Sequence, residues 1–150
     1  MTTGPFFSKL CDELLPKVQG SKRPVVLALQ GPLGIGKTTF AKEFLERLGY
    51  DARKVQSPSF LKLFEYEIPK VGLCVHLDCY RMESVLEFSH LALENYSAAR
   101  LWIVEWPDLF FDFLREQAAL KGLLGLNEGW RLDFKGTPGI VEVGMTEWGS

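Results

Sequence analysis

The chain has 150 residues, a formal net charge of −2 at pH 7, and a composition that is 47% hydrophobic and 24% charged. These values are typical of a globular protein, exclude extensive disorder, and predict one domain over residues 1–150. The small negative charge gives no reason to expect strong binding to nucleic acid or to an anionic membrane surface.

The first third of the chain predicts a helix, a buried strand and a second helix. Apolar residues recur at helical spacing over residues 6–18, which indicates an amphipathic helix that belongs to the core. The short apolar run Val25–Gln30 predicts a buried strand that leads directly into a glycine-rich turn. A second apolar stripe predicts a helix that begins near Lys37, and Gly49 stands where a left-handed C-terminal cap belongs.

The rest of the chain predicts strands that alternate with weaker helical patterns. Two alternating segments joined by a Pro-Lys-Val-Gly turn predict a β-hairpin, a short apolar run predicts another strand, and two segments around Gly-Thr-Pro-Gly predict a terminal hairpin. In chain order the segments are Phe60–Ile68, Leu73–Tyr80, a helix over 83–97, the strand Leu101–Trp106, a helix over 107–119, Trp130–Lys135 and Ile140–Val143. The pattern as a whole predicts an α/β fold.

The turn after the first strand, Gly31-Pro-Leu-Gly-Ile-Gly-Lys-Thr38, satisfies the phosphate-loop pattern in full and lies between a predicted strand and a predicted helix. Glycines allow backbone N–H groups to approach an anion closely, and the helix N-terminus adds a partial positive charge. Lys37 is expected to reach the β- and γ-phosphates, and the Thr38 hydroxyl to bind Mg²⁺. Nucleotide contacts are expected from Gly31, Leu33, Gly34, Ile35, Gly36, Lys37, Thr38 and Thr39.

A phosphate loop works with an acid that holds the metal shell or orients a water molecule. Asp78 and Glu105 stand at the ends of predicted strands, where α/β sheets place ligand-binding groups. The chain has no Asn-Lys-x-Asp segment, the common guanine-reading motif, so the expected nucleotide is ATP.

Three cysteines without a Cys-x-x-Cys pair do not predict a disulfide framework. Cys74, His76, Asp78 and Cys79 resemble a metal-ligand cluster, but alternation along a strand turns Cys79 away from the other three, so buried side chains are expected. No segment has the length of a membrane helix, and the N-terminal residues do not form a signal peptide. A cytoplasmic protein with no membrane contact is expected.

Four blocks in this order resemble the bacterial TsaE (YjeE) family, the ATPase of tRNA threonylcarbamoyladenosine modification. They are Gly31–Thr39, Ser57-Pro-Ser-Phe60, His76-Leu-Asp-Cys-Tyr-Arg81 and Val104-Glu-Trp-Pro107, and the resemblance covers roughly residues 6–115. Ser59, Pro32 and Cys79 stand where the family usually has Thr, Asp and Leu, and none of these changes removes a charge that the chemistry requires.

The resemblance implies a P-loop NTPase-like three-layer sandwich with a mixed sheet, made of a parallel core with antiparallel additions. It implies ATP and Mg²⁺ as ligands, and TsaB and TsaD, which modify adenosine 37 of tRNA, as partners; contact with tRNA is expected to be indirect at most. Carried over by position, Thr38, Asp78 and Glu105 resemble the metal residues, and Lys37, Asp78 and Glu105 the catalytic ones. Ser57–Phe60 resembles a switch-like loop near the γ-phosphate to which Ser59 belongs, and Trp106 is expected beside the nucleotide. Tyr80 and Arg81 are expected to brace that wall or a partner surface.

Two alternatives use the same phosphate loop. A small-molecule P-loop kinase needs an acceptor pocket and an arginine-bearing lid, and residues 83–100 show no clear lid, with Arg81 and Arg100 the arginines in reach. A non-hydrolysing ATP-gated binding module has the same sequence requirements as an ATPase, so residues alone do not separate the two.

Overall fold

The computed structural model describes residues 4–32, 34–54, 63–78, 98–106, 128–137 and 140–147. Two helices and six strands lie in this part of the chain, together with one turn of 3-10 helix (Ala52–Lys54). In chain order they are α1 (Gly4–Gln19), β1 (Val25–Gln30), α2 (Lys37–Arg47), β2 (Leu63–Ile68), β3 (Gly72–Asp78), β4 (Leu101–Trp106), β5 (Glu128–Thr137) and β6 (Ile140–Glu147).

The six strands form one mixed sheet in the order β2-β3-β4-β1-β5-β6. The four inner strands, β3, β4, β1 and β5, pair parallel with one another, whereas the edge strands β2 and β6 pair antiparallel with β3 and β5. Every residue of β1 is buried, as expected for a central strand covered on both faces. The sheet therefore confirms the α/β class and the parallel core with antiparallel additions.

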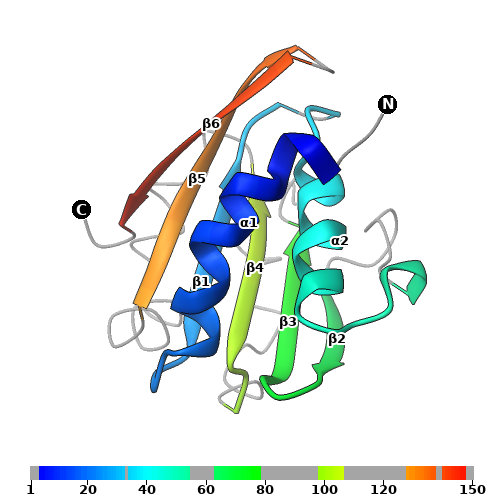
Figure 1. Cartoon of the computed structure of the whole chain (residues 1–150), viewed down its shortest axis with the longest axis vertical. Helices are drawn as coiled ribbons and strands as arrows, with labels where there is room; N and C mark the ends of the chain where they lie inside the picture. The colour runs from blue at the N-terminus through cyan, green and yellow to red at the C-terminus, as the bar shows by residue number, and fades with distance from the viewer. Residues whose placement is uncertain are drawn as a thin grey trace, which may run out of the picture.

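Helices α1 and α2 lie next to each other over the same face of the sheet (Figure 1). Their apolar stripes meet the side chains that alternate toward them from the strands, and Phe7, Phe40 and Phe134 come together where α1, α2 and β5 converge. The opposite face is also buried at its centre, through Val26 and Ala28 of β1, Val75 and Leu77 of β3, and Trp102 and Val104 of β4. The central strands are thus covered on both sides, as in a three-layer sandwich.

Most predicted elements within the described residues are confirmed. Helix α1 packs in the core, the two hairpins form, and Gly49 has the left-handed φ of 97° expected of a helix C-terminal cap. The terminal hairpin is longer than predicted, and β5 joins the sheet by pairing parallel to β1. The helices predicted over 83–97 and 107–119, and positions 60–62 and 79–80 of the first hairpin, lie outside the described residues. None of the described helices is long and apolar enough to cross a membrane.

Replacing Phe40 with alanine should lower the free energy of unfolding by about 3–5 kcal/mol, the usual loss for a large aromatic side chain removed from a core. Phe40 is fully buried and its ring contacts those of Phe7, Phe44 and Phe134. Urea unfolding measures the change, and Glu46→Ala on the exposed side of the same helix is the control, which should stay within about 0.5 kcal/mol of the parent. Equal stability of the two variants would contradict the packing described here.

Candidate nucleotide-binding site

The glycine-rich turn joins the carboxyl end of β1 to the first residue of α2. Gly31, Gly34 and Gly36 all have positive φ, at 154°, 81° and 123°. At Gly31 a side chain would also collide with β5, because its Cβ would lie 2.7 Å from the carbonyl oxygen of Phe134. Only glycine fits at this position, because it has no Cβ and adopts positive φ without strain. The glycine allows the chain to pass close to β5 as it turns from strand to helix.

The turn places the N-terminus of α2 at the end of the sheet where the parallel strands β1, β3 and β4 finish (Figure 1). The first intrahelical bond runs from the Phe40 N–H to the Gly36 carbonyl, at 2.9 Å. The N–H groups of the preceding turn have no intrahelical acceptor, and together with the helix dipole they favour an anion at this position. The Ile35 N–H donates to the Pro32 carbonyl at 3.3 Å, and the Ile35 side chain is buried in the core.

The Lys37 ammonium group points back into this turn. Its Nζ donates to the Gly31 carbonyl at 2.6 Å and to the Pro32 carbonyl at 2.9 Å, and the residue is only 4% exposed. A buried ammonium group held by these two carbonyls places a positive charge inside the turn. The predicted phosphate-binding lysine therefore lies inside the turn that would hold the phosphates.

Glu105 reaches the first turn of α2 from the carboxyl end of β4. Its Oε1 accepts a hydrogen bond from the Thr38 hydroxyl at 3.2 Å, and its Oε2 lies 2.5 Å from Nε2 of His76. Glu105 is 4% exposed and His76 is fully buried. The structure thus brings together two predicted metal residues, Thr38 and Glu105, that are 67 positions apart in sequence.

Asp78 is the last residue of β3 and is paired in register with Glu105 of the neighbouring parallel strand. It is 8% exposed. Because the two residues share a register position, their side chains project from the same face of the sheet, at the carboxyl ends of their strands. The structure therefore places both predicted acids beside the N-terminus of α2.

These residues fit a nucleotide with its magnesium ion. The turn supplies backbone N–H groups and a lysine for phosphates, and Thr38 with the two acids supplies the oxygen atoms that Mg²⁺ prefers. The described residues contain no group of three or more His, Cys, Asp or Glu side chains arranged for a metal ion. A Mg²⁺ site of this class would not need one, because one or two protein groups would hold the ion together with substrate phosphates and water.

Three of the four residues that resemble a metal-ligand cluster, Cys74, His76 and Asp78, lie within the described part of the chain. Cys74 is fully buried, and this burial raises the pKa of its thiol, so the sulfur is uncharged at neutral pH. His76 is engaged with Glu105, and Cys79 lies outside the described residues. The histidine therefore belongs to the nucleotide site and not to a separate cluster with the cysteines.

Several predicted site residues are not placed by the structure. Leu33, the Ser57–Phe60 segment with Ser59, and the Tyr80-Arg81 pair lie outside the described residues, and Trp106 is described as a strand position without its side chain. Thr39 is half-buried in the first turn of α2. The roles of these residues stay predictions.

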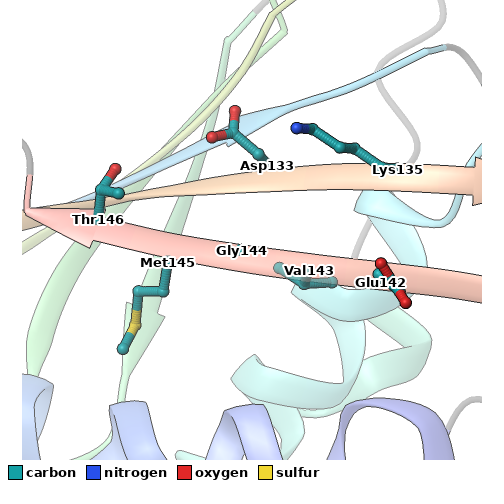
Figure 2. Close-up of a pocket in the computed structure, with 7 residues that line it drawn as sticks. All are labelled: Asp133, Lys135, Glu142, Val143, Gly144, Met145 and Thr146. Carbon is teal, nitrogen blue, oxygen red and sulfur yellow. The ribbon is translucent and has the colours of Figure 1, made fainter.

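A shallow hollow of about 610 Å³ lies elsewhere, on the β5–β6 hairpin. Asp133, Lys135 and Thr146 project from one side of the hairpin and Met145 from the other (Figure 2). Asp133 accepts a hydrogen bond from Nε of Arg131 at 3.0 Å, and Lys135 lies opposite Glu142 in register. The described lining includes none of the predicted site residues, so the hollow does not compete with the phosphate loop as the candidate site.

His76 was not predicted to take part in the chemistry, although one sequence signal indicated it. His76 and Asp78 are two residues apart on a predicted strand, so both face the same side of the sheet. Had the neighbouring strand been known, the diagonal contact between His76 and Glu105 would have followed from the register, in which Asp78 lies opposite Glu105.

Comparison with known proteins agrees with this geometry. The family model described as "Threonylcarbamoyl adenosine biosynthesis protein TsaE" matches residues 7–128. A Bacillus subtilis (strain 168) protein named tRNA threonylcarbamoyladenosine biosynthesis protein TsaE is 42% identical over 93 residues, which are 61% of this chain and 56% of that protein. Proteins of the same name from Rickettsia bellii (strain RML369-C) and Aquifex aeolicus (strain VF5) are 32% identical over 84 residues and 36% identical over 101 residues. These two matches cover 56% and 67% of this chain, and 58% and 68% of the relatives. The chain thus spans little more than half the length of the Bacillus and Rickettsia relatives.

Proposed function

The chain belongs to the TsaE family, and on that premise we propose that it binds ATP with Mg²⁺ and hydrolyses ATP in support of threonylcarbamoyladenosine modification of tRNA. The observation that carries the proposal is the contact between Thr38 at the start of α2 and Glu105 at the end of β4. It joins the phosphate loop to an acid across the sheet, the arrangement that phosphoryl transfer by P-loop proteins requires.

The positions of Lys37, Thr38, Asp78 and Glu105 support a separate role for each residue in ATP binding and hydrolysis. Lys37 binds the β- and γ-phosphates from within the turn, and the Thr38 hydroxyl and Asp78 hold the metal shell. Glu105 orients the attacking water molecule or senses the γ-phosphate. Mg²⁺, when bound, neutralises charge on the phosphates. The absence of an Asn-Lys-x-Asp segment favours ATP over GTP.

The partners in this proposal are TsaB and TsaD, and tRNA contact is indirect. A net charge of −2 supports indirect contact, because direct binding to phosphate backbones is carried by positive charge. All six described strands belong to one sheet, which supports the proposal that residues 1–150 act as one domain. The proposed role belongs to the cytoplasm, where tRNA is modified.

The decisive experiment measures ATP hydrolysis by the purified protein alone and with TsaB and TsaD. We expect slow turnover alone and faster turnover with both partners, because the proposed role of hydrolysis is to act on the partner complex. Transfer of the γ-phosphate to a metabolite would instead identify a kinase. ATP binding without hydrolysis under either condition would replace the ATPase by an ATP-gated binding module.

A further inference from the structure

His76 is in contact with the proposed catalytic acid, yet the proposed function gives it no part. It lies on β3, fully buried, and its Nε2 is 2.5 Å from Oε2 of Glu105. The other carboxylate oxygen of Glu105 accepts the Thr38 hydroxyl. The acid is thus held at two points, one on the phosphate loop's helix and one on the sheet.

The two contacts come from different kinds of group. Thr38 is a predicted Mg²⁺ residue whose hydroxyl donates its hydrogen to Glu105 and keeps its oxygen lone pairs for the metal, so this contact belongs to the nucleotide site itself. His76 lies on a buried strand and is not a predicted ligand of the metal or the nucleotide. The bond from His76 therefore fixes the Glu105 carboxylate to the sheet independently of what the phosphate loop binds.

The proposed function sets the direction of this hydrogen bond. In it Glu105 acts as a carboxylate, which only accepts hydrogen bonds, so the proton in the contact lies on Nε2 of His76. Nδ1 is then left as a buried nitrogen with no hydrogen-bond partner among the described residues. An unsatisfied buried polar atom costs stability, so packing alone does not explain a histidine at this position.

We infer that His76 is a positioning residue for ATP hydrolysis: its Nε2–H orients the Glu105 carboxylate so that one oxygen faces the phosphate loop. This inference rests on the proposed function, in which Glu105 acts on the water molecule or the γ-phosphate. His76 acts only through Glu105 and leaves the affinity for nucleotide to the loop and Lys37.

Two amide variants at this position separate positioning from packing. The terminal amide of His76→Gln can reach the place of Nε2, whereas the shorter side chain of His76→Asn cannot. We expect His76→Asn to lower kcat by about 100-fold, the effect of misplacing a reacting group by about 1 Å, with an unchanged Kd for ADP. His76→Gln should recover most of the turnover. Cys74→Ala, on the same face of the same strand, controls for disturbed packing and should keep the parental kcat.

A double-mutant cycle tests whether His76 acts through Glu105. In the Glu105→Gln background, His76→Asn should cause little further loss of kcat, because the group that it positions is already inactive. If the fall in kcat of the double variant equals the product of the two single falls, the substitutions act independently and the inference is overturned. Equal kcat values for His76→Gln and His76→Asn would overturn it too. So would a rise in the Kd for ADP large enough to account for the lower turnover of His76→Asn.

A measurement without turnover examines the contact itself. The chain has two histidines, so ¹⁵N spectra of the imidazole rings can be assigned with a His90→Gln variant. We expect His76 to be protonated at Nε2 and its resonances to shift in Glu105→Gln but not in Asp133→Asn. A proton on Nδ1 alone would overturn the inference. A wild-type protein that binds ATP without hydrolysing it would refute the proposed function and with it any role of His76 in hydrolysis, and the spectra would still decide separately whether His76 holds Glu105.

Discussion

ATP binding is expected to be lost when Lys37 is replaced by alanine. The ammonium group is buried in the glycine-rich turn, where it now donates to the carbonyls of Gly31 and Pro32. Phosphate oxygens are stronger acceptors than carbonyls, so a bound nucleotide should draw the ammonium toward itself over a short distance. Hydrogen bonds to charged groups contribute about 1.5–3 kcal/mol each, so the loss of two of them should weaken ATP binding by about 100-fold or more.

Calorimetric titration with ATP and Mg²⁺ measures this loss. Lys42→Ala is the matched control, because Lys42 lies on the same helix and is exposed. Both substitutions remove one positive charge, so a general electrostatic effect would weaken binding in both. Unchanged affinity in Lys37→Ala would mean that the turn does not hold the phosphates.

The phosphate loop could be predicted from sequence because its chemistry is local. Glycine spacing, the preceding apolar strand and the following helix all lie within Val25–Arg47, and each constrains the same short turn. Strand alternation likewise predicted the β2–β3 hairpin, because the side chains of neighbouring residues on a strand face opposite sides of the sheet. Local patterns therefore predicted both the loop and the strands that surround it.

The pairing of β5 with β1 did not follow from sequence. Parallel neighbours are joined by long connections, and no local signal states which strand a segment will adopt as its partner. The consequence reaches the site, because the approach of Phe134 on β5 is what leaves no room for a side chain at Gly31. From sequence alone, Gly31 is explained by its conformational freedom. The structure adds a second reason, because β5, far away in the sequence, lies too close to Gly31 to leave space for a Cβ atom.

The His76–Glu105 contact escaped prediction for the same reason. The two residues are 29 positions apart and lie on neighbouring strands whose register is set by the whole β3–β4 pairing. Sequence reasoning compared His76 only with its strand neighbours Cys74, Asp78 and Cys79 and predicted buried side chains rather than a metal site. Proximity along one strand can be read from the sequence, and proximity across strands cannot. The position of Glu105 at a strand end was predicted; the partners that hold it were not.

Glu105→Gln is expected to separate ATP binding from ATP hydrolysis. Glutamine has nearly the same shape, so the phosphate loop and Lys37 should retain the nucleotide. It has lost the charge that would polarise a water molecule, and removal of a general base typically costs about 10²–10⁴-fold in rate. The variant should therefore hold ATP through gel filtration and release little phosphate, alone or with TsaB and TsaD. Glu46→Gln on the exposed side of α2 should behave as the parent.

The same variant separates the ATPase from an ATP-gated binding module. If hydrolysis drives the proposed cycle, Glu105→Gln with TsaB and TsaD should fail to support repeated tRNA modification while ATP stays bound. If occupancy alone is sufficient, modification should continue at the parental rate with unhydrolysed ATP. Hydrolysis at the parental rate would contradict the role of Glu105, and the contacts from Thr38 and His76 would then only hold a buried carboxylate. Because burying an ionised acid is costly unless it is paired, that outcome would make the bond to His76 a requirement of folding rather than of turnover.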